Sequence, residues 1–117
     1  MFETYFGIEI EFSGITRRGA AEIVAKVING RNSGYEVTGP DGRIWKIVYD
    51  SSVGGYRRQG NRMVATNDND YQCELVSPIL TYYRDIGVVQ AIVRKLRKEG
   101  AMTPDTAGIH YQKQEIM

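Results

Sequence analysis

The stretch that decides the fold is Phe6-Gly7-Ile8-Glu9-Ile10-Glu11-Phe12, in which apolar and acidic residues alternate. Side chains along a strand point alternately to opposite faces, so the apolar even-numbered residues share one face and the two glutamates share the other. Glu9 and Glu11 are then roughly 7 Å apart at a rise of about 3.3 Å per residue. Carboxylates this close repel unless a cation lies between them, and Mg²⁺ prefers carboxylate oxygens. The pattern fits either a metal site or the solvated outer face of an edge strand.

Length and composition predict one small globular domain, residues 1–117. Of the 117 residues, 42% are hydrophobic and 25% are charged, which is ordinary for a chain with a single core. The net charge of +1 gives no field that would indicate nucleic-acid binding, although such binding stays possible. The single cysteine, Cys73, fits a reducing compartment. Because neither a membrane-spanning stretch nor a signal peptide is visible, we expect a cytoplasmic protein without membrane contacts.

The order of the predicted elements indicates an α+β fold. Apolar periodicity and turn residues predict two helices, over about 17–29 and 82–99, and strands over 4–13, 35–38, 44–49, 71–76 and 108–111. Residues 54–70 are polar and form a long loop or an exposed hairpin with Gln59-Gly60-Asn61 at its tip. This order gives two helices packed on one face of a largely antiparallel sheet. The face that carries Glu9 and Glu11 then looks away from the core.

Four segments together resemble the amidoligase family, whose members are similar to glutamate–cysteine ligase and glutamine synthetase. The segments are Gly7-Ile8-Glu9-Ile10-Glu11-Phe12, Trp45-Lys46-Ile47-Val48-Tyr49-Asp50-Ser51-Ser52, Glu74-Leu75-Val76-Ser77-Pro78-Ile79-Leu80 and Gly108-Ile109-His110-Tyr111-Gln112. The resemblance covers essentially the whole chain but only the first half of the family's domain. It implies half of a glutamine-synthetase-like catalytic fold.

The resemblance also implies a mechanism, in which ATP phosphorylates a substrate carboxylate and an amine then displaces phosphate. Carried over by position, it implies metal ligands at Glu9, Glu11 and Glu74, catalytic positions at Asp50 and His110, and cofactor-binding positions at Lys46 and Ser51. Mg²⁺ and ATP are the implied cofactors. This agrees with the residues themselves, since carboxylates on a common face of several strands can converge on a hard cation.

Two departures from the family shift the expected function. Gln112 replaces the second histidine of the family's last motif and carries no titratable charge. The chain also ends five residues after Gln112, without the family's downstream half, so we expect no turnover from a lone monomer.

The first hypothesis is therefore a macromolecule-binding, inhibitory module of phage or mobile-element type, without a cofactor. A CRISPR nuclease or another host defence protein is one conceivable target. Its predicted contact residues lie in the polar segment 54–70 and are Tyr56, Arg57, Arg58 and Arg62, since tyrosine and arginine are enriched in interfaces. Simple solvation would also explain the arginines. The alternative is an ATP- and Mg²⁺-dependent carboxylate–amine ligase that a homodimer or a second chain completes.

Overall fold

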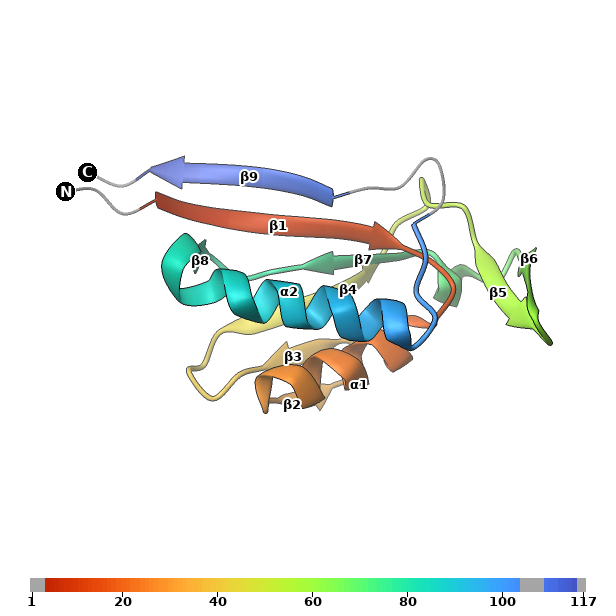
Figure 1. Cartoon of the computed structure of the whole chain (residues 1–117), viewed down its shortest axis with the longest axis horizontal. Helices are drawn as coiled ribbons and strands as arrows, with labels where there is room; N and C mark the ends of the chain where they lie inside the picture. The colour runs from red at the N-terminus through yellow and green to blue at the C-terminus, as the bar shows by residue number, and fades with distance from the viewer. Residues whose placement is uncertain (1–3, 104–108, 116–117) are drawn as a thin grey trace.

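The computed structural model describes residues 4–103 and, through their backbone, residues 109–115 (Figure 1). The elements in chain order are β1 (Thr4–Phe12), α1 (Arg17–Ile28), β2 (Arg31–Ser33), β3 (Glu36–Thr38), β4 (Ile44–Tyr49), β5 (Tyr56–Gln59), β6 (Arg62–Ala65), the 3₁₀ turn η1 (Asn69–Tyr71), β7 (Cys73–Val76), β8 (Leu80–Thr81), α2 (Tyr82–Lys98) and β9 (Ile109–Glu115).

The main sheet in this part of the chain has seven strands and is antiparallel at each of its pairings. Its order is β2-β3-β4-β7-β1, and β1 has β7 and then β8 along one edge and β9 along the other. Helices α1 and α2 contact each other and lie over the same face of the sheet (Figure 1). The predicted α+β class, with two helices on one face, is confirmed.

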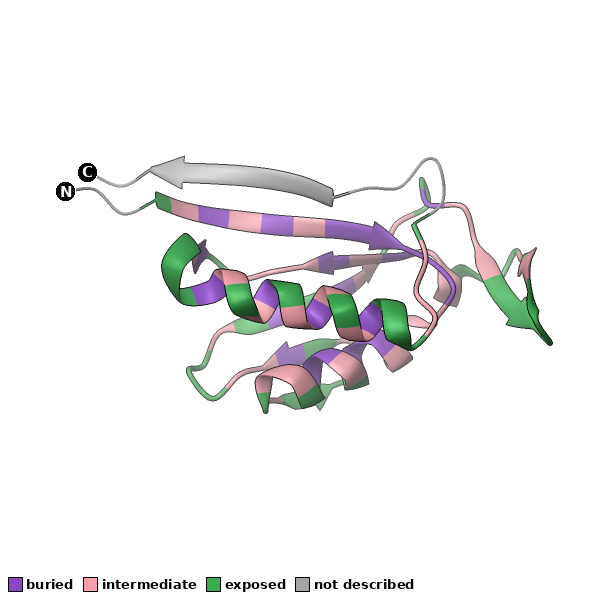
Figure 2. Ribbon diagram, in the orientation of Figure 1, coloured by how far each residue is buried: buried purple, intermediate pink, exposed green. Residues whose placement is uncertain are grey.

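The core lies between the sheet and the two helices. Phe6, Ile8, Ile10 and Phe12 are all buried there, and the alternation along β1 is visible in Figure 2. Trp45 and Ile47 of β4 are buried on the same face. The glutamates of β1 therefore project from the opposite face of the sheet, as their alternation predicts.

Local signals set the ends of α1. The Thr16 hydroxyl accepts a hydrogen bond from the Gly19 backbone N–H at 3.0 Å, which satisfies one of the free donors of the first turn. At the other end, Asn29 adopts the left-handed conformation with φ of 56°, and its N–H bonds to the Ala25 carbonyl. The predicted start and end of this helix are both confirmed.

A serine separates β7 from β8. The Ser77 N–H donates to the Ile8 carbonyl at 2.9 Å, and the Ser77 hydroxyl accepts from the Ile8 N–H at 2.8 Å. The side chain thus replaces a carbonyl in the ladder, and Pro78, which has no N–H to donate, can follow. Strand β1 thereby stays paired where the neighbouring strand turns away.

The segment after β4 contains an exposed hairpin, as one of the two sequence alternatives stated. Strands β5 and β6 form a separate two-stranded sheet whose turn has Gly60 at φ of 63°. Ser13, which follows β1, holds the base of the hairpin: its hydroxyl accepts from the Tyr56 N–H at 2.7 Å. Neither helix of the described chain is long and apolar enough to cross a membrane.

Candidate carboxylate site

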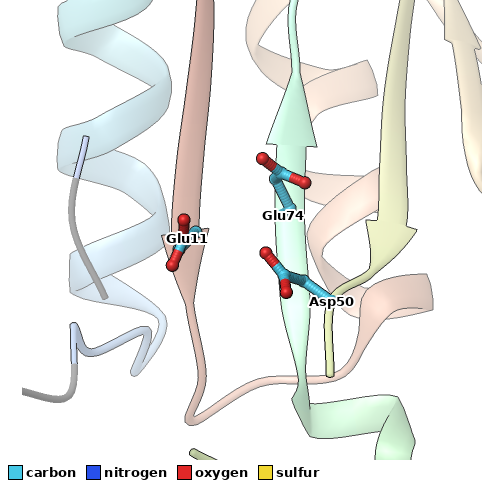
Figure 3. A group of neighbouring side chains, drawn as sticks. All are labelled: Glu11, Asp50 and Glu74. Carbon is cyan, nitrogen blue, oxygen red and sulfur yellow. The ribbon is translucent and has the colours of Figure 1, made fainter. Parts of the chain in front are cut away.

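Three carboxylates meet on the sheet face opposite the helices. Glu11 comes from β1, Glu74 from β7, and Asp50 from the residue that follows β4 (Figure 3). Each can offer an oxygen such that the three oxygens lie within 4.8 Å of one another. Glu11 is buried and the other two are half-buried, so the cluster combines close spacing with restricted access to water.

The strand register brings these residues together. Glu11 is the direct partner of Glu74 across the β1–β7 ladder, and Glu74 is the partner of Val48 across the β7–β4 ladder. Asp50 lies two residues beyond Val48 and so returns to the same face. Its N–H donates to the Gln72 carbonyl at 3.1 Å, which continues the pairing past the end of β4. Opposed residues in an antiparallel pair have side chains close together.

The electrostatics of the cluster favour a cation. Burial, a hydrogen bond with Glu9 and the negative charges of Glu9, Asp50 and Glu11 together raise the pKa of the Glu74 carboxyl to about 7. Like charges at this spacing disfavour ionisation. The hydrogen bond with Glu9 favours the protonated form of Glu74, and a divalent cation would relieve the repulsion between the carboxylates. Carboxylate oxygens on three strands fit a hard cation such as Mg²⁺.

Two of the three predicted metal ligands belong to the carboxylate cluster, and the third lies next to it. Glu11 and Glu74 lie in the cluster itself, and Glu9 contacts Glu74 from the same face. The third member is Asp50, which the sequence assigned to catalysis. The structure thus gathers all four acidic residues named from the sequence.

The other predicted site residues lie at different distances from the cluster. Lys46 is exposed between the buried residues Trp45 and Ile47, so it shares the outer face with the carboxylates. Ser51 is exposed, and its backbone carbonyl accepts a hydrogen bond from the Gln72 side-chain amide at 3.4 Å. The backbone of His110 pairs with Glu9 across β1 and β9, and the side chains of His110 and Gln112 lie outside the described residues.

Two residues that the sequence did not indicate complete the site. The Asp50 Oδ1 atom accepts hydrogen bonds from the Ser52 N–H at 2.9 Å and the Ser52 hydroxyl at 2.6 Å. The Gln72 side-chain amide donates to the Val53 carbonyl at 2.8 Å. The Asp-x-Ser spacing is a known local turn signal and could have revealed Ser52. Gln72 gave no comparable signal.

The predicted partner-binding residues lie on the β5–β6 hairpin. Arg57, Arg58 and Arg62 are exposed, and Tyr56 is half-buried at the hairpin base. Arg57 pairs with Val64 and Gln59 with Arg62, so Arg57 and Arg62 share one face of the hairpin. Within residues 4–103, none of the three arginines forms an ion pair.

Cys73 is not part of the site. Its side chain is fully buried on the core face, and burial raises the pKa of the thiol to about 12. A thiol that stays protonated is a poor nucleophile.

The fold and the cluster define an α+β protein with a convergent carboxylate site on the sheet face that its helices leave open. Residues 3–113 match the family described as "Putative amidoligase enzyme". The chain belongs to this family, as its four segments suggested. No significant match was found among curated proteins or among solved structures.

Proposed function

We propose that this chain is a metal-dependent carboxylate–amine ligase domain whose Mg²⁺ site is formed by Glu11, Asp50 and Glu74. The observation that supports it is the convergence of three carboxylate oxygens within 4.8 Å, in a chain of the amidoligase family. A buried or half-buried carboxylate cluster without a cation is electrostatically unfavourable, and the pKa of Glu74 is raised accordingly. Selection for stability alone would not place these charges together.

The protein's own groups have distinct tasks in this proposal. Glu11, Asp50 and Glu74 hold the cation, and Glu9 stabilises Glu74 from the side. When bound, Mg²⁺ supplies charge neutralisation for the phosphate oxygens of ATP. Lys46 offers a mobile ammonium group on the same face, suited to an anionic phosphate or carboxylate. The side chains on this sheet face would therefore position the reacting groups and neutralise the phosphate charge. Positioning and charge neutralisation are most of what phosphoryl transfer requires.

The first experiment measures nucleotide-dependent turnover. With Mg²⁺, ATP and a panel of carboxylic acids and amines, we expect phosphate release by the wild-type chain. Glu74→Gln should reduce the rate by about 100-fold or more, since each metal-bound carboxylate contributes strongly to the site. Glu22→Gln, which removes an exposed carboxylate on α1, is the matched control and should leave the rate unchanged. The proposal fails if the wild type neither releases phosphate nor binds Mg²⁺.

The same assay tests whether one chain suffices. If a second copy completes the site, the rate per chain rises with protein concentration, because assembly precedes turnover. A rate per chain that stays constant over a 100-fold range of concentration contradicts completion by a homodimer.

A second candidate function is binding of a macromolecule through the β5–β6 hairpin. The observation that favours it is the exposure of three arginines, which form no ion pair within residues 4–103, on a hairpin that forms its own two-stranded sheet. Arginine presents a planar fork of donors that suits acidic partners. An inhibitory module of phage or mobile-element type, directed at a host defence protein, would use such a surface.

The test of the second candidate is a pull-down with a charge-reversed hairpin. We expect the wild-type chain to retain a specific host protein and Arg57→Glu with Arg62→Glu to lose it by at least about tenfold. Arg18→Glu, another exposed arginine but on α1, is the control. Equal retention by all three chains contradicts a role of the hairpin.

A further inference from the structure

Strand β9 forms one edge of the main sheet along its whole length. It pairs with β1 at seven consecutive positions, from Thr4 opposite Glu115 to Ile10 opposite Ile109. Within the described part of the chain, β1 is its only partner, and no described helix crosses it in Figure 1. The N–H and C=O groups of a strand point to its two sides in turn, so about half of those in β9 point away from β1.

This edge lacks most of the features by which sheets avoid pairing with another chain, which are short edge strands, prolines, bulges and charges. The opposite edge, β2, has only three residues. Strand β9 has seven residues and no proline, and its register with β1 runs without an offset, so the ladder contains no bulge. The outer side of β9 is therefore a template for a further antiparallel strand.

The sequence of β9 suits pairing with a second copy of itself. Two identical antiparallel edge strands are related by a two-fold axis perpendicular to the sheet, so one residue must lie opposite its own copy. In the register that overlaps all seven residues, this residue is Gln112, the midpoint of the strand. A neutral amide can both donate to and accept from its copy.

The same register also keeps like charges apart. It places Lys113 opposite Tyr111 of the second copy. It places Glu115 opposite Ile109, so neither charged residue of β9 meets a like charge directly across the pair. A register centred on Lys113 would oppose two ammonium groups and overlap fewer residues. Length and charge therefore favour the register centred on Gln112.

We propose that β9 is a self-association edge, which pairs with β9 of a second copy of this chain in an antiparallel register centred on Gln112. The two main sheets then form one continuous sheet. Because the axis is perpendicular to the sheet, both helix layers lie on one face and both carboxylate clusters lie on the other. This inference goes beyond the proposed function, since it does not require that the carboxylates bind a cation.

The experiment is sedimentation equilibrium of the full chain without metal, as wild type and as Gln112→Lys and Gln112→Glu. We expect a wild-type dimer with a Kd of about 100 μM or tighter. Each substitution places two like charges opposite each other at the axis and should weaken the dimer by about tenfold or more. An equimolar mixture of the two variants should restore the dimer, because opposite charges then meet at the axis.

Gln114→Lys and Gln114→Glu are the matched controls. Gln114 lies two residues from Gln112, but the proposed register places it opposite His110 of the second copy. Each control should stay within about threefold of the wild-type Kd, and mixing them should give no gain. In β1, Gln112 is opposite Gly7, which has no side chain, so a charged residue at position 112 meets no side chain directly across that ladder.

Hydrogen exchange of the wild-type chain gives a second test that needs no substitution. When the protein concentration is raised about 100-fold, alternate N–H groups of β9, those that point away from β1, should exchange more slowly. The N–H groups bonded to β1 should change less. Melting temperatures show whether each variant is folded, and the exchange result decides alone if the variants at position 112 are not.

Three outcomes would overturn the inference. The first is a wild-type chain that stays monomeric at about 1 mM. The second is a dimer that folded Gln112→Lys and Gln112→Glu retain in full, or that their mixture does not restore, since the copies would then meet elsewhere or in another register. The third is exchange in β9 that does not depend on concentration. None of these outcomes bears on the carboxylate cluster, which Mg²⁺ binding and phosphate release test separately.

Discussion

At the scale of single residues, Glu74 is where the acidic cluster affects stability. Its pKa is raised to about 7 in the folded chain, from an ordinary value of 4.5. Between these values the folded state binds more protons than the unfolded state, so the free energy of unfolding falls as the pH rises through this window. The raised pKa of Glu74 therefore lowers the stability of the metal-free protein above neutral pH relative to its stability at acid pH, as far as this one group contributes.

Glu74→Gln should remove this dependence. We expect the variant to be more stable than the wild type at pH 8 in the presence of EDTA and nearly equal to it at pH 4.5, because a protonated glutamate resembles glutamine. Urea unfolding of both chains between pH 4.5 and 8 measures the difference. Mg²⁺ at pH 8 should raise the melting temperature of the wild type more than that of the variant. If the free energies of unfolding of the two chains change with pH in parallel, the pKa of Glu74 is not raised in the folded state.

The sequence predicted the residues of the site better than their arrangement. Glu9 and Glu11 could be assigned to one face because alternation along a strand is local. That Asp50, Glu11 and Glu74 lie within 4.8 Å depends on the register of two ladders, which is set by contacts between residues far apart in the chain. For Asp50 the family resemblance implied a place at the substrate or metal site, but its position beside Glu11 and Glu74 follows from the strand register.

At the scale of elements, an ion pair connects the β3–β4 turn to the start of α2. Asp85 is buried and accepts two hydrogen bonds from Arg43, at 2.7 and 3.0 Å, and one from the Thr81 N–H at 2.8 Å. Burial alone would raise the pKa of Asp85, but the bonds from Arg43 and Thr81 outweigh it and lower the pKa. The Thr81 side chain makes no capping bond, so Asp85 supplies the cap of this helix.

Asp85→Ala should destabilise the protein by about 2–3 kcal/mol, since it removes three charge-assisted bonds and leaves Arg43 without its main partner. Asp41→Ala removes the other carboxylate on Arg43, which is more exposed, and should cost less than about 1 kcal/mol. Denaturant unfolding of both variants tests the order. If the two variants lose the same free energy of unfolding, the burial of Asp85 does not strengthen its ion pair with Arg43.

The elements that the sequence missed are short or polar. Strand β2 is Arg31-Asn32-Ser33, and β8 has two residues, so neither carries a periodic signal and each exists through its pairing partner. In α2, the apolar residues Val89, Ile92 and Leu96 are buried, and Asp85 is buried beside them. A buried charge is unpredictable from a helix alone when its partner, Arg43, lies 42 residues away.

At the scale of the whole molecule, three distant segments meet at the end of β1. Ser13 exchanges two backbone hydrogen bonds with Met102, which follows α2, and Gly14 donates to the Tyr56 carbonyl at the base of the hairpin. The same end of β1 carries Glu11. The junction therefore joins the helix layer, the hairpin and the carboxylate site.

Gly14 allows these segments to approach one another closely, because it has no Cβ. Its φ is 88°, and an added Cβ would lie 2.4 Å from the Gly100 carbonyl oxygen, a backbone atom that cannot move aside without shifting the end of α2. Gly14→Ala should cost about 3 kcal/mol or more, from backbone strain of about 1–2 kcal/mol and from overpacking of similar size. Gly60→Ala is the matched control, because its φ is 63° and its Cβ would meet nothing within 4 Å; it should cost only the strain of about 1–2 kcal/mol.

Urea unfolding gives both values, and Mg²⁺ titration of Gly14→Ala shows whether the junction also supports the site. If the end of β1 is held by this close approach, the variant should lose stability and bind Mg²⁺ more weakly, since Glu11 lies three residues before Gly14 on the same segment. Gly60→Ala, at the far tip of the hairpin, should bind Mg²⁺ like the wild type. If the two variants have equal free energies of unfolding, the close approach of the three segments does not contribute to the stability of the fold. Unchanged Mg²⁺ binding in a destabilised Gly14→Ala would mean that the sheet alone positions the carboxylates.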